Sequence, residues 1–361
     1  MSTFPESDAL HERARAFVGA FERGDAMPET FDALAADLAR FQAKHVPGYA
    51  RLCDARHVDP RTIERAAQAP CVPTDVFKMA RVATFPEGHA TAAFRTSGTT
   101  IGDRGKHEMR VTATYDAGAL AFGRWALASD LRRAPLVVSL TKGDADSSLA
   151  HMVELFRVEI GGGDGGYAFD GEILDLAWLD EVVARACNEE RPVLVCATSF
   201  ALVAFLDALD GAPFPLPEGS RVMQTGGFKG KTREVDAREL RWNARNALRI
   251  PERNIACEYG MTELSSQFYE ATIREPGAPH SVYVEPPWAR VVPGHPETLE
   301  PVPEGQEGLA RIEDLLNVDS AFAVLARDRV RRAGPAGFVL LGREPGAPPR
   351  GCSIATEEML G

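Results

Sequence analysis

The apolar run Val193-Leu-Val-Cys-Ala197, followed by Thr198-Ser199, sets the pattern for the central part of the chain. Five successive apolar residues predict a buried strand, and Ser199 is a residue type that often begins a helix. The same reasoning predicts three more strands at Leu136–Leu140, Arg221–Gln224 and Ile255–Glu258, with helices at 148–158, after Ser199 and at 233–248. This alternation predicts a largely parallel sheet covered by helices.

The two regions that flank this central part have different sequence patterns. Apolar residues at helical spacing predict two amphipathic helices before residue 90, one on Leu10, Ala14, Phe17 and Phe21 and one on Phe31, Leu34, Leu38 and Phe41. A further helix is expected at 115–129, with Thr114 as its N-cap. Beyond 280, Pro and Gly are frequent, and short β-type stretches are predicted at 281–285, 308–313, 321–326 and 337–341.

The sequence therefore predicts an α/β fold in four segments. Residues 1–90 form a helical N-terminal region packed on the core, 91–280 the α/β core, 281–345 a smaller β-rich subdomain, and 346–361 a short tail that carries Cys352. The Pro-rich stretch before Cys352 indicates a tail too mobile to be core.

Composition excludes several classes of protein. The 361 residues carry 40 Lys+Arg against 52 Asp+Glu, a net charge of −12, which argues against binding nucleic acid or an anionic membrane surface. No apolar stretch reaches the roughly 18 residues of a membrane span. The N-terminus lacks the basic-then-apolar pattern of a signal peptide, so a cytoplasmic protein is expected. The six cysteines show no CxxC spacing and the eight histidines no metal-ligand spacing.

Three short stretches have the residue types of a ligand site. Thr96-Ser-Gly-Thr-Thr100 offers hydroxyls and accessible backbone N–H groups, the chemistry of a phosphate cradle, although a polar surface loop has the same composition. Val222–Lys231 places Gly226 and Gly227 after a predicted strand, where a surface hairpin is the alternative. Glu258-Tyr-Gly-Met-Thr-Glu263 follows another strand, where doubly wound sheets bind ligands and where a simple helix start is also expected.

None of these stretches is a Walker A loop. Gly230-Lys231-Thr232 has the correct ending, but residue 225, where that motif requires glycine, is Thr225. Gly105-Lys106 fails in the same way, because Thr100 and His107 occupy the other required positions.

In this order, the stretches resemble the adenylate-forming (acyl-AMP ligase) superfamily. Its later elements match Asp328 and Gly342-Arg343. Phe77-Lys78, Thr225-Gly-Gly-Phe-Lys-Gly230 and Arg350-Gly-Cys-Ser353 make the chain similar to one branch, the LuxE-type acyl-protein synthetases, over about residues 70–361. The resemblance implies an adenylate-forming core with parallel sheets flanked by helices and a smaller β-rich section near the C-terminus.

The resemblance also implies roles for individual residues. It places the ATP phosphates on Thr96, Ser97, Gly98, Thr99 and Thr100, the adenine and acyl pockets at Gly226 and Gly227, adenine beside Tyr259, the α-phosphate at Thr262 and Mg²⁺ on Glu263. Asp328 matches the aspartate that binds the ribose hydroxyls, with Asp314 and Asp319 as rivals, and Arg343 is expected to reach the same ribose.

Two roles concern catalysis. Superfamily members usually end in a mobile domain that carries a catalytic lysine. This sequence is too short to hold such a domain beyond Arg343. Our hypothesis is that Lys229 or Lys231 replaces its lysine. Cys352 matches the family's acyl-accepting cysteine, and nearby Arg350 is expected to favour its thiolate.

The implied function is ATP-dependent activation of a carboxylic acid, a fatty acid in this family, to acyl-AMP. Transfer to Cys352 and delivery to a partner such as an acyl reductase would follow. Two alternatives stay open: a coenzyme A ligase of the phenylacetate type, and a non-catalytic member that binds only an acyl or nucleotide ligand.

Overall fold

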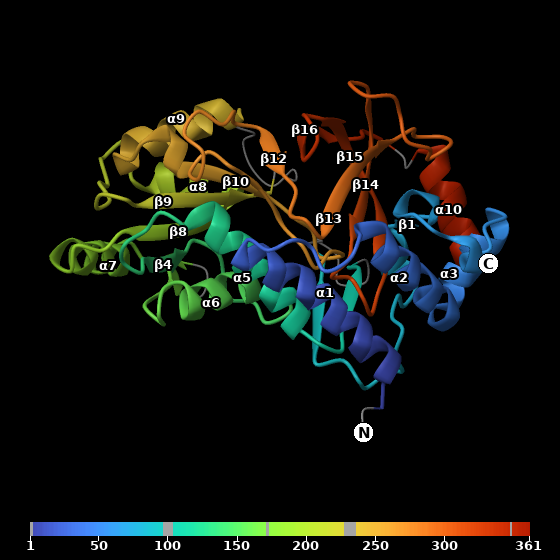
Figure 1. The fold of residues 1–361 in the computed structure, drawn as a ribbon. Coiled ribbons are helices and arrows are strands. Elements are labelled where there is room, and N and C mark those ends of the chain that lie inside the picture. Colours follow the sequence, from blue (N-terminus) through green and yellow to red (C-terminus); the bar gives the residue numbers. More distant parts are fainter. Residues whose placement is uncertain (1–2, 97–103, 171–172, 227–235, 347–348) are drawn as a thin grey trace. The chain divides into compact units, whose positions relative to one another are not determined.

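A computed structural model describes residues 3–96, 104–170, 173–226, 236–346 and 349–361. The chain forms two compact units, and each is built from separate stretches of sequence (Figure 1). Unit 1 comprises Met1–Ala121, Met261–Ser266 and Val284–Gly361, and unit 2 comprises Phe122–Gly260 and Gln267–Tyr283. The segment boundaries at residues 90, 280 and 345 divide the chain into continuous stretches of sequence, and they stay a prediction.

Unit 2 contains the parallel sheet that the apolar runs predicted. Strands β5, β4, β8, β9 and β10 are parallel neighbours in that order, and β11 is antiparallel to β10. The strands of this unit are β4 (Leu136–Ser139), β5 (Gly165–Tyr167), β8 (Val193–Thr198), β9 (Arg221–Thr225), β10 (Ile255–Tyr259), β11 (Phe268–Glu270) and β12 (Val282–Val284), with a separate pair β6 (Phe169–Asp170) and β7 (Ile173–Leu174).

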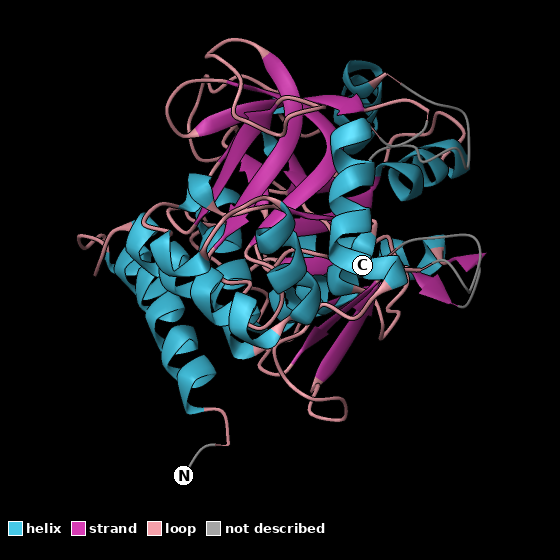
Figure 2. Cartoon of the chain, turned by 90° about the vertical axis from the view of Figure 1, so that its right-hand side faces the viewer, coloured by secondary structure: helices cyan, strands magenta, loops and turns pink. Residues whose placement is uncertain are grey.

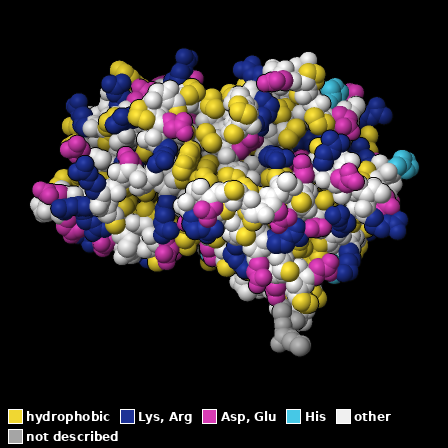
Figure 3. Space-filling view, in the orientation of Figure 1, with side chains coloured by type: hydrophobic (Ala, Val, Ile, Leu, Met, Phe, Trp, Pro, Cys, Tyr) yellow, Lys and Arg dark blue, Asp and Glu magenta, His cyan; other side chains and the backbone are white. Residues whose placement is uncertain are grey.

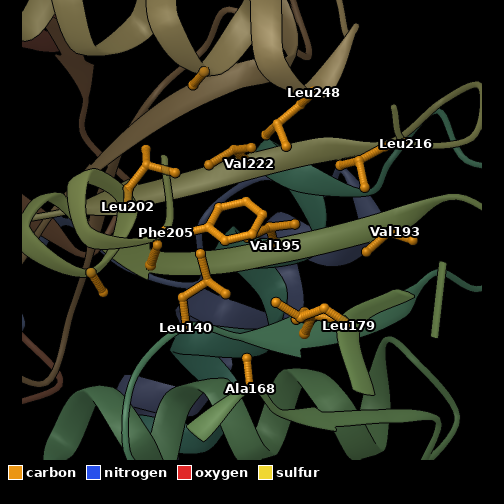
Figure 4. Packing of buried hydrophobic residues seen from close by; sticks show 14 of the residues in the cluster. Leu140, Ala168, Leu179, Val193, Val195, Leu202, Phe205, Leu216, Val222 and Leu248 are labelled. Carbon is orange, nitrogen blue, oxygen red and sulfur yellow. The ribbon is translucent and has the colours of Figure 1, made fainter. Parts of the chain in front are cut away.

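Helices cover both faces of this sheet. Alternate strand residues pack with α7 (Leu176–Asn188), α8 (Ser199–Ala208) and α9 (Ala237–Leu248) in one apolar cluster, in which Phe205 lies among Val195, Val222 and Leu202 (Figure 4). Helix α6 (Ser148–Glu159) lies on the other side, against β4 (Figure 1). Burial on both faces explains why these strands are continuous apolar runs without alternation.

Unit 1 begins with the two expected helices, α1 (Pro5–Arg23) and α2 (Phe31–His45). Two helices that were not predicted follow, α3 (Pro47–Ala55) and the short α4 (Val76–Met79). Next come the hairpin of β2 (Ala92–Arg95) and β3 (Lys106–Met109) and then α5 (Ala113–Leu127), which continues into unit 2. The expected cap Thr114 lies inside α5 instead. Its hydroxyl contacts His11 at 2.8 Å and accepts from Arg15 at 3.0 Å, so tertiary contacts in α1 override its capping preference.

The last part of unit 1 is rich in strands, as the sequence predicted, and neighbouring strands there are antiparallel. Strands β13 (Ala289–Gly294), β14 (Glu307–Asp314), β15 (Ala323–Arg332) and β16 (Gly337–Arg343) pair in sequence order, and β1 (Val72–Pro73) adds in parallel to β15.

The predicted mobile tail is wrong for residues 350–360. They form α10 (Arg350–Leu360), the helix that ends beside the C-terminus in Figure 2. Its buried residues Gly351, Cys352, Ala355 and Met359 recur at helical spacing, and α10 packs against α3, β1 and α4. Arg51 of α3 donates to the Met359 carbonyl at 2.6 Å. Pro349 precedes the helix, which explains how a Pro-rich stretch that looks like a linker can begin a packed element.

The surface agrees with the mixed charge of the sequence. On the face shown in Figure 3, Lys and Arg side chains are interspersed with Asp and Glu. Among the described residues, no helix is long and apolar enough to cross a membrane.

Candidate functional site

The Ser/Thr-rich loop begins and ends on a closed hairpin in unit 1. Thr96 N–H donates to the Gly105 carbonyl at 2.9 Å, and the Thr96 hydroxyl accepts from Gly105 N–H at 2.8 Å. Arg104 Nε donates to the Thr96 carbonyl at 2.7 Å. The predicted phosphate-binding residues Ser97, Gly98, Thr99 and Thr100 lie outside the described residues, so only the base of this loop, with Thr96, is located.

The segment that carries Thr262 and Glu263 lies against this hairpin. His107 is on β3, directly after the loop, and its Nδ1 lies 2.7 Å from the Thr262 carbonyl oxygen. A carbonyl can only accept, so Nδ1 carries the proton. Burial lowers the pKa of His107 to about 4, so the ring is neutral near pH 7. The structure therefore places the strand that follows the Ser/Thr loop against the segment that carries Thr262 and Glu263.

A buried polar cluster holds the rest of that segment. Asn317 Nδ2 donates to the Glu263 carbonyl at 2.7 Å, while its Oδ1 accepts from the Ser265 hydroxyl at 2.6 Å. The Asp314 carboxylate accepts from Ser265 N–H at 2.8 Å and from the Ser266 hydroxyl at 2.7 Å. We call His107, Asp314 and Asn317 the backbone cradle. Burial raises the pKa of Asp314 to about 6.

The three candidate aspartates have different surroundings. Asp314 is in the backbone cradle, and Asp319 is 6 % exposed and accepts from Ser7, His11, Thr84 and Arg110. Asp328 is half-buried on β15 and lies directly opposite the exposed Arg343 on β16. The structure thus pairs the two residues for which the resemblance implied a common ribose, and the rivals have structural partners of their own.

Two further predicted site residues, Gly226 and Tyr259, lie in unit 2. Gly226 directly follows β9 with φ +71°, a conformation that favours glycine, and its carbonyl accepts from the Ser199 hydroxyl. Tyr259 ends β10 and is 7 % exposed, with its ring 5.9 Å from that of Tyr283. Gly227, Lys229 and Lys231 fall outside the described residues.

Glu258 was not singled out from the sequence. Its side chain is 5 % exposed, accepts from the Thr225 hydroxyl, and has a pKa raised to about 7 by burial. The sequence contained one indication that Glu258 is unusual, because it is an acidic residue within a predicted buried strand. His107 and Asn317 had no such sign, because their partners are distant in the sequence.

The expected reactive state of Cys352 is wrong for this conformation. The residue is 2 % exposed in the first turn of α10, and burial raises the pKa of its thiol to about 11. Exposed Arg350 does not offset the loss of solvation.

Within the described residues, no group of three or more His, Cys, Asp or Glu could hold a metal ion. Magnesium at a nucleotide commonly uses one or two carboxylates plus phosphate oxygens, so a single carboxylate such as Glu263 fits that donor set.

Solved structures share this fold. A 2-hydroxyisobutyryl-CoA ligase in an open conformation with 2-HIB-AMP and CoA matches with a TM-score of 0.62 at 12% identity, over 86% of this chain and 74% of that one. The same ligase in its thioesterification state matches with a TM-score of 0.63 at 13% identity, over 95% and 69% of the two chains. At this identity the likeness shows the fold alone.

A comparison with curated proteins gives no match. Residues 22–360 match the family described as acyl-protein synthetase, LuxE. Since this match spans nearly the whole chain, the protein belongs to the LuxE acyl-protein synthetase family and is a ligase with the fold of the adenylate-forming enzymes.

Proposed function

We propose that the protein uses MgATP to convert a carboxylic acid, a fatty acid by its family, to acyl-AMP and then transfers the acyl group to a thiol. One observation carries the proposal. The hydrogen bond of 2.7 Å between His107 and the Thr262 carbonyl joins the strand that leaves the Ser/Thr loop to the segment that bears Glu263.

In the first step a carboxylate oxygen attacks the α-phosphorus and pyrophosphate leaves. Both reactants are anions, so the site must supply positive charge and hydrogen-bond donors. Residues 96–100 and Thr262 would bind the phosphates, and Glu263 would hold magnesium, which supplies Lewis-acid stabilisation of the phosphate oxygens. Asp328 and Arg343 would bind the ribose, and Gly226, Gly227 and Tyr259 would line the adenine and acyl pockets.

In the second step a thiolate attacks the acyl carbon and AMP leaves. We propose Cys352 as the acceptor, from which a partner such as an acyl reductase would receive the acyl group. Because Cys352 is buried and its thiol pKa is raised, this step requires α10 to leave its packed position first.

A diffusible thiol such as that of coenzyme A is the second candidate acceptor. The burial of Cys352 favours it, since a free thiol in solution needs no movement of α10.

The test is ATP–pyrophosphate exchange with short, long-chain and aromatic acids, together with intact-mass detection of acylated protein. We expect the wild type to catalyse exchange and Glu263→Ala to lose this activity. The absence of exchange with every acid would leave only the non-catalytic, ligand-binding alternative.

Cys352→Ser distinguishes the acceptors. We expect it to retain exchange and to lose a hydroxylamine-labile acyl label. Unchanged labelling removes Cys352 from the mechanism, and release of AMP that depends on coenzyme A, without acylated protein, supports the second candidate.

The replacement for the usual catalytic lysine is tested separately. Lys229→Ala and Lys231→Ala are each expected to slow exchange if that lysine neutralises the phosphates. Full exchange in both variants contradicts the hypothesis.

A further inference from the structure

The backbone that carries Thr262 and Glu263 is held by side chains that are not expected to touch a substrate. His107 donates to the carbonyl of the first residue and Asn317 to that of the second, each at 2.7 Å. Both side chains are nearly inaccessible, with His107 2 % and Asn317 1 % exposed. Both donors are thus shielded from water, and loss of either would leave the carbonyl that it binds without that hydrogen bond.

The two donors are themselves fixed. Asn317 Nδ2 also donates to the Ala321 carbonyl at 2.9 Å, and its Oδ1 accepts from Ser265. His107 is held on β3 by its register opposite Phe94 on β2. The strand that leaves the Ser/Thr loop thus fixes Thr262, and the turn before β15 fixes Glu263.

We propose that His107 and Asn317 are positioning residues for MgATP, acting through the backbone of Thr262 and Glu263. The inference rests on the proposed function, in which those two residues meet the α-phosphate and the metal. A shift in either carbonyl would displace the attached side chain, and small displacements of phosphate and metal ligands are costly to catalysis.

This role predicts a specific pattern of defects. His107→Leu removes the donor from the Thr262 carbonyl, and His107→Asn restores it, because the amide nitrogen of asparagine can replace Nδ1 of histidine. For His107→Leu we expect the KM for MgATP to rise by at least about tenfold, the effect of losing a buried hydrogen bond. The KM for the acid is expected to change by less than about twofold, with His107→Asn close to the wild type.

A binding measurement removes the dependence on turnover. Calorimetric titration with ATP, with magnesium and with EDTA, measures how strongly the metal increases nucleotide affinity. We expect His107→Leu and Asn317→Leu to lose most of that increase and His107→Asn to retain it. If His107→Leu does not fold, Asn317→Ser replaces it, since serine also lacks an amide donor that reaches the Glu263 carbonyl.

Matched controls separate positioning from general stability. His11 is 3 % exposed in the same unit, but it bonds Thr114 and Asp319 and not residues 262–266. Asn254 is 8 % exposed and donates to the Ser220 carbonyl at 2.9 Å in unit 2. His11→Leu and Asn254→Leu are expected to lower the melting temperature while leaving the magnesium dependence of ATP binding unchanged.

Two results would overturn the inference. One is a His107→Leu protein that melts earlier but binds MgATP as tightly as the wild type, and the other is an equal loss of MgATP affinity in the control variants. If the wild type itself binds no MgATP, the proposed function falls together with this inference. A wild type that binds and a His107→Leu that binds equally well remove this inference alone.

Discussion

Glu258 is a buried carboxyl group whose charged form is disfavoured. Its pKa is raised from 4.5 to about 7 by burial, while the Thr225 hydroxyl partly opposes the shift. Between these values the unfolded chain releases the proton and the folded chain retains it. The contribution of Glu258 to the free energy of unfolding is therefore fully present below pH 4.5. About 3 kcal/mol of it is lost as the pH rises through 7.

Glu258→Gln is expected to abolish this loss, because the amide has the same shape and no charge to bury. Urea unfolding at about pH 4.5 and about pH 8 measures it: the wild type should lose about 3 kcal/mol more than the variant. Glu190→Gln is the control, since that side chain is 81% exposed. An equal pH dependence of wild type and Glu258→Gln would mean that Glu258 ionises normally in the fold.

At the scale of residues, the sequence predicted the site residues that lie within a recognisable motif. It did not predict the residues that act through a hydrogen bond to a partner distant in the sequence. Thr262 and Glu263 stood out within a recognisable stretch. His107 lies 155 positions from its partner Thr262, and no local pattern indicates such a pairing.

At the scale of elements, α10 illustrates why a short apolar stripe can be overlooked. Four small or apolar residues at positions 351, 352, 355 and 359 are buried, but the Pro residues before them predicted a linker. The packing against α3 supplies the stability that a helix of 11 residues lacks by itself. By contrast, β4, β8, β9 and β10 of unit 2 were predicted correctly, because they lie in a regular alternation of apolar strands and helices, whereas the short β5 and β11 were not predicted.

We expect the packing of α10 to control the reactivity of Cys352, which is buried in that helix. Arg51 donates to the Met359 carbonyl through both Nε and Nη2, at 3.2 and 2.6 Å. Arg51→Ala removes these bonds, so we expect thiol-reagent labelling of Cys352 to accelerate by about 10- to 100-fold. The time course is measured in a Cys187→Ser background, because Cys187 is an exposed thiol.

Arg61→Ala is the control for that experiment. Its side chain is 87% exposed and pairs with Asp59, so its loss should leave the labelling rate unchanged. If Cys352 in the wild type reacts as fast as Cys187, the docked position of α10 is not the dominant state in solution.

The contact of α5 with α6 gives a prediction about packing. A methyl group added at Gly123 would overlap Cζ of Phe156, a side chain that is fully buried. Although alanine favours helices by about 1 kcal/mol over glycine, overpacking costs about 1–3 kcal/mol, so we expect Gly123→Ala to destabilise the protein in urea unfolding.

Gly19→Ala in α1 is the matched substitution. Its methyl group would meet only the guanidinium end of Arg23, a flexible side chain. It is expected to leave stability unchanged or raise it by up to about 1 kcal/mol. Equal effects at the two glycines would contradict the close contact with Phe156.

At the scale of the whole molecule, both compact units are discontinuous in sequence. The alternation of apolar strands with helices predicted the sheet of unit 2, since each of those elements has a local signal in the sequence. The assembly of unit 1 from the N-terminal helices and the C-terminal strands depends on buried polar contacts over more than 200 positions, and such contacts leave no periodic pattern.

Asp319 is the main contact of that kind. Its carboxylate accepts from Ser7 and His11 of α1 at 2.6 and 2.9 Å, and from Arg110 at 3.2 Å. Burial opposes its ionisation, but the hydrogen bond from His11 and the charge of Arg110 lower its pKa below the ordinary value of 3.8. Its contribution to stability is therefore present above pH 3.8 and is lost as pH falls further.

Asp319→Asn is expected to lower the free energy of unfolding by about 1–3 kcal/mol near pH 7, since it replaces one of two buried acceptor oxygens with an amide donor. It also removes the negative charge beside Arg110, which keeps its ion pair with Asp8. Urea unfolding should show this difference and its decrease as pH falls below the ordinary carboxyl pKa. Asp25→Asn is the control, because Asp25 and its partner Arg23 are 56% and 65% exposed, and its effect should stay under about 1 kcal/mol. If both aspartates prove equally dispensable, then Asp319 does not join α1 to the C-terminal part of unit 1, and apolar packing alone holds that unit together.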